Sequence, residues 1–330
     1  MIFGKSDMLT FIKKPIAYSL LPTAKFLQQI SHKLQRSKMN FAIHGRPFKD
    51  EAKPHIKALF VALEQNEVEV QITDSYFKLL EEAGIKHNFT KTFTDKNDIQ
   101  HPDYMISLGG DGTLLDSVTL VAERETPIIG VNVGRLGFLA QFSPVNIAET
   151  IPLILNKQYE LDRRSLLSVE SEIDMFNGLN FGLNDFVITK TDTSSMIVIH
   201  SQINGEFLNT YWADGLVIST PTGSTGYSLS VGGPVVMPHC QNFVIAPVSP
   251  HNLNVRPMLV EDTSIITVEV ESRSKNFLVS LDSRSKVVEG RVPITIKKEK
   301  FGARLIKISD HSFLKTLRSK LNWGLDNRTW

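Results

Sequence analysis

The 330-residue sequence contains a single cysteine, Cys240. One cysteine excludes an intrachain disulfide and a zinc site built from several cysteines. The chain also lacks an uninterrupted apolar run of about 18 residues, so it offers no candidate for a membrane-spanning helix. Its formal net charge is only +1, so no strong overall field favours binding to nucleic acid.

The remaining composition is that of an ordinary globular protein, with 42% hydrophobic and 22% charged residues. The length favours about two domains, each with enough chain to bury a core. We expect a protein that binds neither nucleic acid nor a membrane.

The first 38 residues differ from the rest of the chain in charge. Their lysines and arginines stand against one acid, Asp7, and several leucines and isoleucines would share one helix face. This composition fits an organelle-targeting leader or a helix lying on a membrane surface. Because Pro15 and Pro22 interrupt such a helix, we instead expect residues 1–38 to be a dispensable extension, disordered or without function.

Residues 39–160 alternate between strand-like and helix-like patterns. Short apolar runs at 41–44, 68–72, 104–108 and 127–133 are typical of buried strands, with helical spacing between them. This alternation predicts a Rossmann-like α/β domain with a parallel sheet, whose ligands bind beyond the carboxyl ends of the strands. The G-x-G-x-x-G fingerprint is absent, so an ordinary hydride-transfer domain is not favoured.

Residues 161–300 carry the patterns of a β-rich domain. Alternating or β-branched runs recur at 166–170, 196–201, 265–270 and 292–296. Asn204-Gly205 predicts a two-residue hairpin turn, because both residues accept positive φ values. We expect a β-sandwich-like domain here. Residues 301–330 are then expected to return to the first domain as a strand and a helix.

Gly109-Gly110-Asp111-Gly112-Thr113 connects a predicted strand to a predicted helix. Its three glycines allow a phosphate to approach backbone N–H groups at a helix N-terminus, which Thr113 is expected to cap. Asp111 is unusual there because a carboxylate repels phosphate. Either it is a structural turn residue, or it binds a metal or accepts the proton of an attacking hydroxyl during phosphoryl transfer.

Two further polar segments lie in the β-rich half. Residues 220–230 follow a buried strand and are dense in hydroxyls and glycines, with Tyr227 available to stack on a planar ring. Such a run is either a surface loop or a backbone-lined site for a base or sugar. Asn184-Asp185 is similarly either a turn or a pair that binds ribose hydroxyls.

Taken together, these segments resemble the NAD kinase family. Residues 109–113 match its GGDGT loop, residues 130–139 are similar to its GxNxGxLGFL segment, and Asn184-Asp185 matches its Asn-Glu/Asp pair. Asp214-Gly215 and the run Thr220 to Ser230 match its DG...TPTGSTAYSLS stretch, with Gly226 where alanine is common. The order and spacing agree from about Asn40 to the C-terminus.

The resemblance implies phosphorylation of the 2′-hydroxyl of the adenosine ribose of NAD, giving NADP. It implies ATP or another phosphoryl donor, a divalent cation expected to be Mg²⁺, and a cytoplasmic homodimer or homotetramer. Asp111 would be the proton acceptor, Gly112 would lie at the phosphate, Asn184 and Asp185 would bind NAD, and Asp214 would contact it near the nicotinamide end. The adenosine pocket would be lined by Thr225, Gly226, Tyr227, Ser228, Leu229 and Ser230.

Three other interpretations remain. A lipid or sphingoid-base kinase shares the GGDGT loop, although residues 134–138 differ from the segment that such kinases resemble. A non-catalytic NAD sensor would bind the dinucleotide without converting it. A hydrolase with Ser224 or Ser228 as nucleophile lacks an evident downstream Asp-then-His arrangement. Asp282-Ser283-Arg284 matches the family poorly, and we expect a solvated hairpin there.

Overall fold

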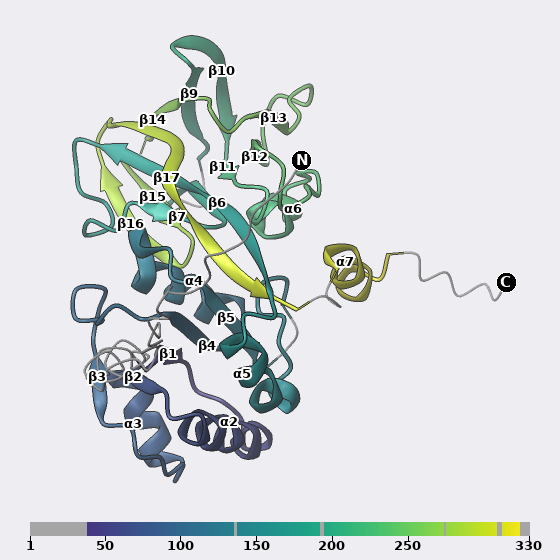
Figure 1. Ribbon diagram of the computed structural model, residues 1–330. Coiled ribbons are helices and arrows are strands. Elements are labelled where there is room, and N and C mark those ends of the chain that lie inside the picture. Colours follow the sequence, from purple (N-terminus) through teal and green to yellow (C-terminus); the bar gives the residue numbers. More distant parts are fainter. Residues whose placement is uncertain (1–37, 135–136, 192–194, 274, 309–311, 324–330) are drawn as a thin grey trace, which may run out of the picture. The chain divides into compact units, whose positions relative to one another are not determined.

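The computed structural model describes residues 38–134, 137–191, 195–273, 275–308 and 312–323 (Figure 1). The expected N-terminal extension, apart from Lys38, therefore lies outside the described residues, as do Arg135 and Leu136 of the segment at 130–139. No helix within the described ranges is long and apolar enough to cross a bilayer.

Five parallel strands form the first part of a large sheet, in the spatial order β5-β4-β1-β2-β3. Their bounds are β1 Asn40–Gly45, β2 Glu69–Thr73, β3 Lys91–Phe93, β4 Tyr104–Gly109 and β5 Ile128–Asn132. The helices between and after them are α2 Lys53–Gln65, α3 Asp74–Glu82, α4 Asp111–Val121 and α5 Ile147–Leu155, with the 3-10 turns η1 Asp50–Ala52, η2 Ala122–Arg124 and η3 Pro144–Asn146.

Side chains of β4 alternate between two apolar clusters. Ile106 packs in a cluster that contains Leu59 of α2 and Ile151 of α5, whereas Met105 packs with Leu114 of α4 on the other side. Both faces of the parallel sheet are therefore covered by helices, which explains why its strands are continuously apolar.

The second half is β-rich. Strands β6 Glu160–Ser171, β7 Phe181–Gly182, β9 Ile197–Ile203, β10 Glu206–Ala213, β14 Ile266–Glu271 and β17 Pro293–Lys307 continue the large sheet. A second, antiparallel sheet has the order β13-β12-β11-β8-β15-β16. Its strands are β8 Asp185–Lys190, β11 Gly215–Ser219, β12 Asn242–Val248, β13 Met258–Glu261, β15 Asn276–Leu281 and β16 Arg284–Glu289.

One apolar cluster fills the space between strands of the two sheets. Its members include Ile199 and Val268 of the large sheet with Phe186 and Phe277 of the antiparallel sheet. Short helical turns η4 Gly223–Thr225 and α6 Tyr227–Ser230 follow β11, and helix α7 Phe313–Leu321 follows β17. The expected α/β region followed by a sandwich-like β region is confirmed.

Strand β17 belongs to both regions. Near its start it pairs antiparallel with β14, and near its end Leu305 pairs with Ile128 of parallel strand β5. The sequence predicted a strand at 292–296 and a separate strand within 301–330, with Lys297, Lys298 and Lys300 between them. The structure instead runs the strand to Lys307, with a register shift between Lys298 and Gly302 that absorbs the interruption.

Two local predictions have opposite outcomes. The Asn204-Gly205 turn is confirmed, since it joins β9 to β10 with φ values of 52° and 83°. The prediction that Thr113 caps α4 is wrong, because Gly110 is the N-cap and Thr113 lies buried within the first turn. The chain turns into the helix three residues earlier than expected, which makes Asp111 the first helical residue.

We predict that Ile106→Ala lowers the free energy of unfolding by about 2–5 kcal/mol, the usual cost of removing a fully buried aliphatic side chain. Urea denaturation measures the effect. Val61→Ala on α2, where the side chain is 41% exposed, is the control and should cost under about 1 kcal/mol. Equal losses in the two variants would contradict the assigned core.

Candidate active site

The glycine loop lies at the carboxyl edge of the parallel sheet. Gly109 is the last residue of β4 and pairs with Asn132, the last residue of β5. The backbone of Arg46, just after β1, also reaches this edge, where its N–H donates to Leu108 O at 3.2 Å. The loop therefore opens where parallel α/β sheets bind ligands.

Asp111 is fixed by the segment that follows β5. Its Oδ2 accepts a hydrogen bond from Phe138 N at 2.8 Å, and its Oδ1 accepts from Leu139 N at 3.0 Å and Ala140 N at 3.2 Å. A carboxylate offers about four lone-pair positions. Three are used, so one position on Oδ2 remains for a further donor.

The glycines around Asp111 are of two kinds. A Cβ at Gly109 would overlap Thr113, and one at Gly137 would overlap the Asp111 carboxylate, so packing requires both glycines. A Cβ at Gly110 would have no neighbour within 4 Å, and one at Gly112 would have only Arg46 Nη1 at 3.9 Å. Since glycine in a helix costs about 1 kcal/mol relative to alanine, the open space at Gly112 favours a ligand that approaches the backbone there.

A second cluster forms at the start of β8. Thr220 N donates to Asn184 O at 2.8 Å, and a Cβ at Gly223 would overlap the Asn184 backbone. Asp185 accepts a hydrogen bond from the Tyr227 backbone N–H. The structure therefore brings Asn184-Asp185 and the segment 220–227 together, as one polar cluster.

The Asp282 carboxylate binds the backbone of this cluster. Its Oδ2 accepts from Leu183 N at 2.8 Å, and its Oδ1 accepts from Asn184 N at 2.8 Å and Asp185 N at 3.2 Å. The expected hairpin is present between β15 and β16, but the description of Asp282 as merely solvated is wrong. A carboxylate following an apolar strand was the available sequence signal; its partners lie 97–99 residues away.

The carboxyl groups of Asp185 and Asp282 both have raised pKa values. Burial, together with the nearby charge of Asp282, raises the pKa of Asp185 to about 7. Burial also raises the pKa of Asp282, although its three backbone donors and the charge of Arg284 oppose the shift. Asp185 therefore changes charge in the neutral range, where an added hydrogen-bond donor would favour its ionised form.

Arg284 links the polar cluster to the glycine-loop helix. Its guanidinium donates to the backbone oxygens of Leu179 and Phe181 and lies 5.9 Å from the centres of the Phe176 and Phe181 rings. Its charge also interacts favourably with that of Asp116 on α4. Arg284 therefore lies within electrostatic range of both the Asp282 carboxylate and helix α4, which begins at the glycine loop.

The remaining predicted residues occupy different environments. Tyr227 is 40% exposed, whereas Ser228 is fully buried and its Oγ has no hydrogen-bond partner among the described atoms. Thr225 Oγ1 donates to Thr222 O at 3.3 Å. Gly226 is exposed, and Leu229 and Ser230 lie in the short helix α6.

Asp214 is not brought to this cluster within the chain. It precedes β11, while Thr220 follows the other end of that strand, which places them roughly 20 Å apart at about 3.3 Å per strand residue. There Asp214 Oδ1 forms an ion pair with Lys190 Nζ at 2.7 Å.

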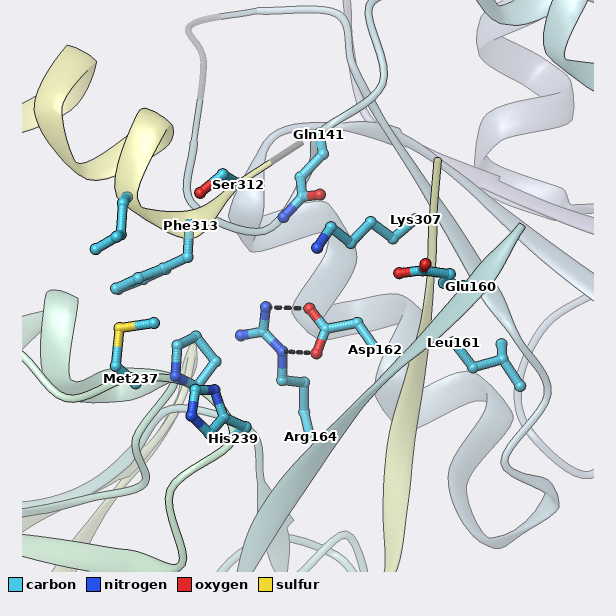
Figure 2. Close-up of a pocket in the computed structure, with 12 residues that line it drawn as sticks. Gln141, Glu160, Leu161, Asp162, Arg164, Met237, His239, Lys307, Ser312 and Phe313 are labelled. Carbon is cyan, nitrogen blue, oxygen red and sulfur yellow. Dashed lines mark hydrogen bonds and ion pairs between the residues drawn. The ribbon is translucent and has the colours of Figure 1, made fainter. Parts of the chain in front are cut away.

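A cavity of about 430 Å³ is lined by residues that include Asp162, Arg164 and Lys307, and by none of the predicted site residues (Figure 2). In it, Arg164 binds the Asp162 carboxylate through Nε and Nη2 at 2.8 and 2.6 Å, and its Nη1 donates to Thr222 Oγ1 at 3.2 Å. Arg164 is almost fully buried. It therefore supports the 220–227 segment through Thr222.

Comparison with known proteins assigns the family. Residues 23–159 match the model of the ATP-NAD kinase N-terminal domain, and residues 183–307 match that of the ATP-NAD kinase C-terminal domain. The chain belongs to the NAD kinase family. A lipid kinase that shares only the GGDGT loop would not account for both matches.

Relatives and solved structures agree with the assignment. NAD kinases of Cytophaga hutchinsonii and Flavobacterium psychrophilum are 48% and 44% identical to the chain, each over 88% of it and 100% of their own length. Yeast NADH kinase complexed with NADH has the same fold, with a TM-score of 0.80 at 21% identity, covering 90% of this chain and 91% of its own. An Archaeoglobus fulgidus NAD kinase in complex with ATP superimposes with a TM-score of 0.65 at 25% identity, covering 86% and 99%.

We predict that Gly223→Ala lowers the free energy of unfolding by about 1–3 kcal/mol, because the added Cβ overpacks against the Asn184 backbone. Gly226→Ala is the matched control: its Cβ would meet Gly223 O at 3.2 Å, a tight contact that a small shift relieves, so the cost should stay under about 1 kcal/mol. Urea denaturation compares the two. A larger loss in Gly226→Ala would refute the close approach of residue 223 to Asn184.

We also predict that Asp185→Asn raises stability in a pH-dependent manner. The pKa of Asp185 in the folded state, about 7, is above the ordinary 3.8, so folding becomes less favourable as pH rises from about 4 to about 7, and the loss levels off at higher pH. The asparagine variant should be at least about 1 kcal/mol more stable than wild type at pH 8, because it carries no buried charge. The gain should shrink toward zero near pH 4; a gain that is constant across this range would contradict the raised pKa.

Proposed function

We propose that this member of the NAD kinase family transfers a phosphoryl group from ATP to the 2′-hydroxyl of the adenosine ribose of NAD, with Asp111 as the proton acceptor. The observation that supports it most directly is the open lone-pair position on Asp111 Oδ2 beside the uncovered backbone of Gly112. The loop thus combines a proton acceptor with a surface that phosphate can approach.

In the proposed reaction, the ribose oxygen forms a bond to the terminal phosphorus of ATP while the bond from that phosphorus to the bridging oxygen breaks, releasing ADP. The hydroxyl proton passes to Asp111 Oδ2. Because phosphoryl transfer has a loose transition state, a carboxylate held in position suffices to accept this proton late in the reaction. The backbone donors of Phe138, Leu139 and Ala140 supply that fixed position.

The polar cluster is proposed to bind NAD. Asn184 and Asp185 would accept or donate hydrogen bonds to its hydroxyls, and residues 225–230 would surround the adenosine, with the exposed ring of Tyr227 stacking on the base. Hydroxyl donors would stabilise the charged form of Asp185, so NAD binding and deprotonation of this carboxyl would be coupled.

A divalent cation, expected to be Mg²⁺, is proposed to accompany ATP. Mg²⁺ in kinases is bound mainly by substrate phosphates and water, with one or two carboxylates. The described residues contain no group of three or more metal-ligating side chains, and an arrangement in which the phosphates carry the cation fits them. When bound, the cation neutralises phosphate charge during transfer.

The position of Asp214 supports a homo-oligomeric enzyme. Within one chain this residue lies at the far end of β11 from the polar cluster, so we propose that it contacts the nicotinamide end of an NAD bound by a second copy. A homodimer or a homotetramer would both allow that contact.

We predict that Asp111→Asn lowers kcat by roughly 10²–10⁴-fold, the range for loss of a general base. A coupled assay with NAD, ATP and magnesium, in which an NADP-specific dehydrogenase detects the product, measures turnover. Asparagine would also turn an amide toward a backbone donor, so thermal denaturation and NAD binding are measured in parallel.

Asp103→Asn is the control for that experiment. Asp103 also accepts a backbone hydrogen bond, from Asn40 N at 2.8 Å, but precedes β4 at the opposite edge of the sheet, and its variant should retain full turnover. Normal turnover in Asp111→Asn would refute the assigned base. A wild-type protein that binds NAD but forms no NADP would instead indicate a non-catalytic sensor.

A further inference from the structure

The open face of Gly112 is bordered by one cationic side chain. Apart from the adjacent residues and the backbone of α4, Arg46 Nη1 is the one atom of the described residues that lies within 4 Å of a Cβ placed on Gly112, at 3.9 Å. Arg46 follows β1, and its backbone N–H bonds to Leu108 O, immediately before the glycine loop. The guanidinium therefore comes from a separate strand of the sheet, yet lies at the surface where the loop exposes its backbone.

Asp116 fixes the orientation of that guanidinium. Asp116 Oδ2 accepts from Arg46 Nε at 2.9 Å and pairs with Nη2 at 2.7 Å, while His44 Nε2 lies 3.6 Å from the same oxygen. These contacts occupy one edge of the guanidinium. Nη1 has no hydrogen-bond partner among the described residues, and the Arg46 side chain is 54% exposed, so its remaining N–H groups are accessible to a ligand.

A cationic side chain at the glycine loop would offset the negative charges of the nearby carboxylates. Asp111 and Asp116 both lie in the first two turns of α4, so a phosphate that approaches the helix N-terminus meets two carboxylates. Arg46 offsets the charge of Asp116 and keeps donors free for phosphate oxygens, which planar guanidinium groups bind well.

From this geometry we propose that Arg46 binds phosphate oxygens of a nucleotide at the glycine loop, and that Asp116 is the positioning residue that holds it there. The inference rests on the proposed function, in which the loop receives the transferred phosphoryl group. Two sources supply such oxygens: the triphosphate of ATP and the pyrophosphate of NAD.

The test compares Arg46→Gln, Arg46→Lys and Arg291→Gln in the full chain. Arg291 is the matched control, because it is also 54% exposed and paired with carboxylates, Glu269 and Glu271, but lies in the β-rich region. The KM for ATP is measured at saturating NAD, and the KM for NAD at saturating ATP. Calorimetry with ATP alone and NAD alone supplies dissociation constants without turnover.

Arg46→Gln should raise the KM and the dissociation constant of one nucleotide by about 10–100-fold, as expected for a lost hydrogen bond between charged groups. An effect on ATP alone identifies the donor triphosphate, and an effect on NAD alone identifies its pyrophosphate. Arg46→Lys should recover part of the affinity, because it keeps the charge but loses the planar geometry. Arg291→Gln should match wild type.

Unchanged affinity for both nucleotides in Arg46→Gln would overturn the proposal, whatever happens to kcat. So would a loss equal to that of Arg291→Gln, or a loss explained by lower thermal stability. If wild type binds both nucleotides but forms no NADP, the proposed function fails while the calorimetric comparison still decides the role of Arg46.

Discussion

The site depends on two aspartate carboxylates, each of which binds three consecutive backbone N–H groups of a distant segment. Asp111 holds residues 138–140, and Asp282 holds residues 183–185. Residues 138–140, 183 and 184 lie outside the regular strands and helices, and Asp185 is the first residue of β8. Unpaired buried donors are costly. The two carboxylates accept hydrogen bonds from these N–H groups and thereby fix the positions of residues 138–140 and 183–185.

Asp111 and Asp185 lie in different electrostatic environments. Asp111 lies half-buried at a helix N-terminus, whose dipole favours a negative charge. Asp185 is buried next to a second carboxylate, and its pKa rises to about 7. In the proposed reaction, Asp111 would receive the proton of a hydroxyl, and Asp185 would respond to hydrogen-bond donors on the substrate.

The sequence was most informative where the physical cause is local. Neighbouring residues in the sequence determine the buried parallel strands, the Asn204-Gly205 turn and the loops rich in glycine or hydroxyl groups. These predictions agree with the structure. The function of Asp282 was not predictable in this way, because its partners are almost a hundred residues away. Arg46 was missed for a related reason: only the pairing of β1 with β4 brings it to Gly112. The length of β17 was underestimated because its central lysines resemble a loop until β6 is placed beside them.

The shared strand β17 also constrains how the chain can be assembled during synthesis. One edge of β5 pairs with β4, but the other is completed near Ile128 by Leu305, a residue 177 positions later. The α/β region therefore leaves the ribosome with part of an apolar sheet edge unpaired until residue 305 has been synthesised. Such late, long-range pairing slows folding, and an open edge invites pairing with other chains. The pairing of β17 with β5 is thus the step that covers this sheet edge and lowers the tendency of the nascent chain to aggregate.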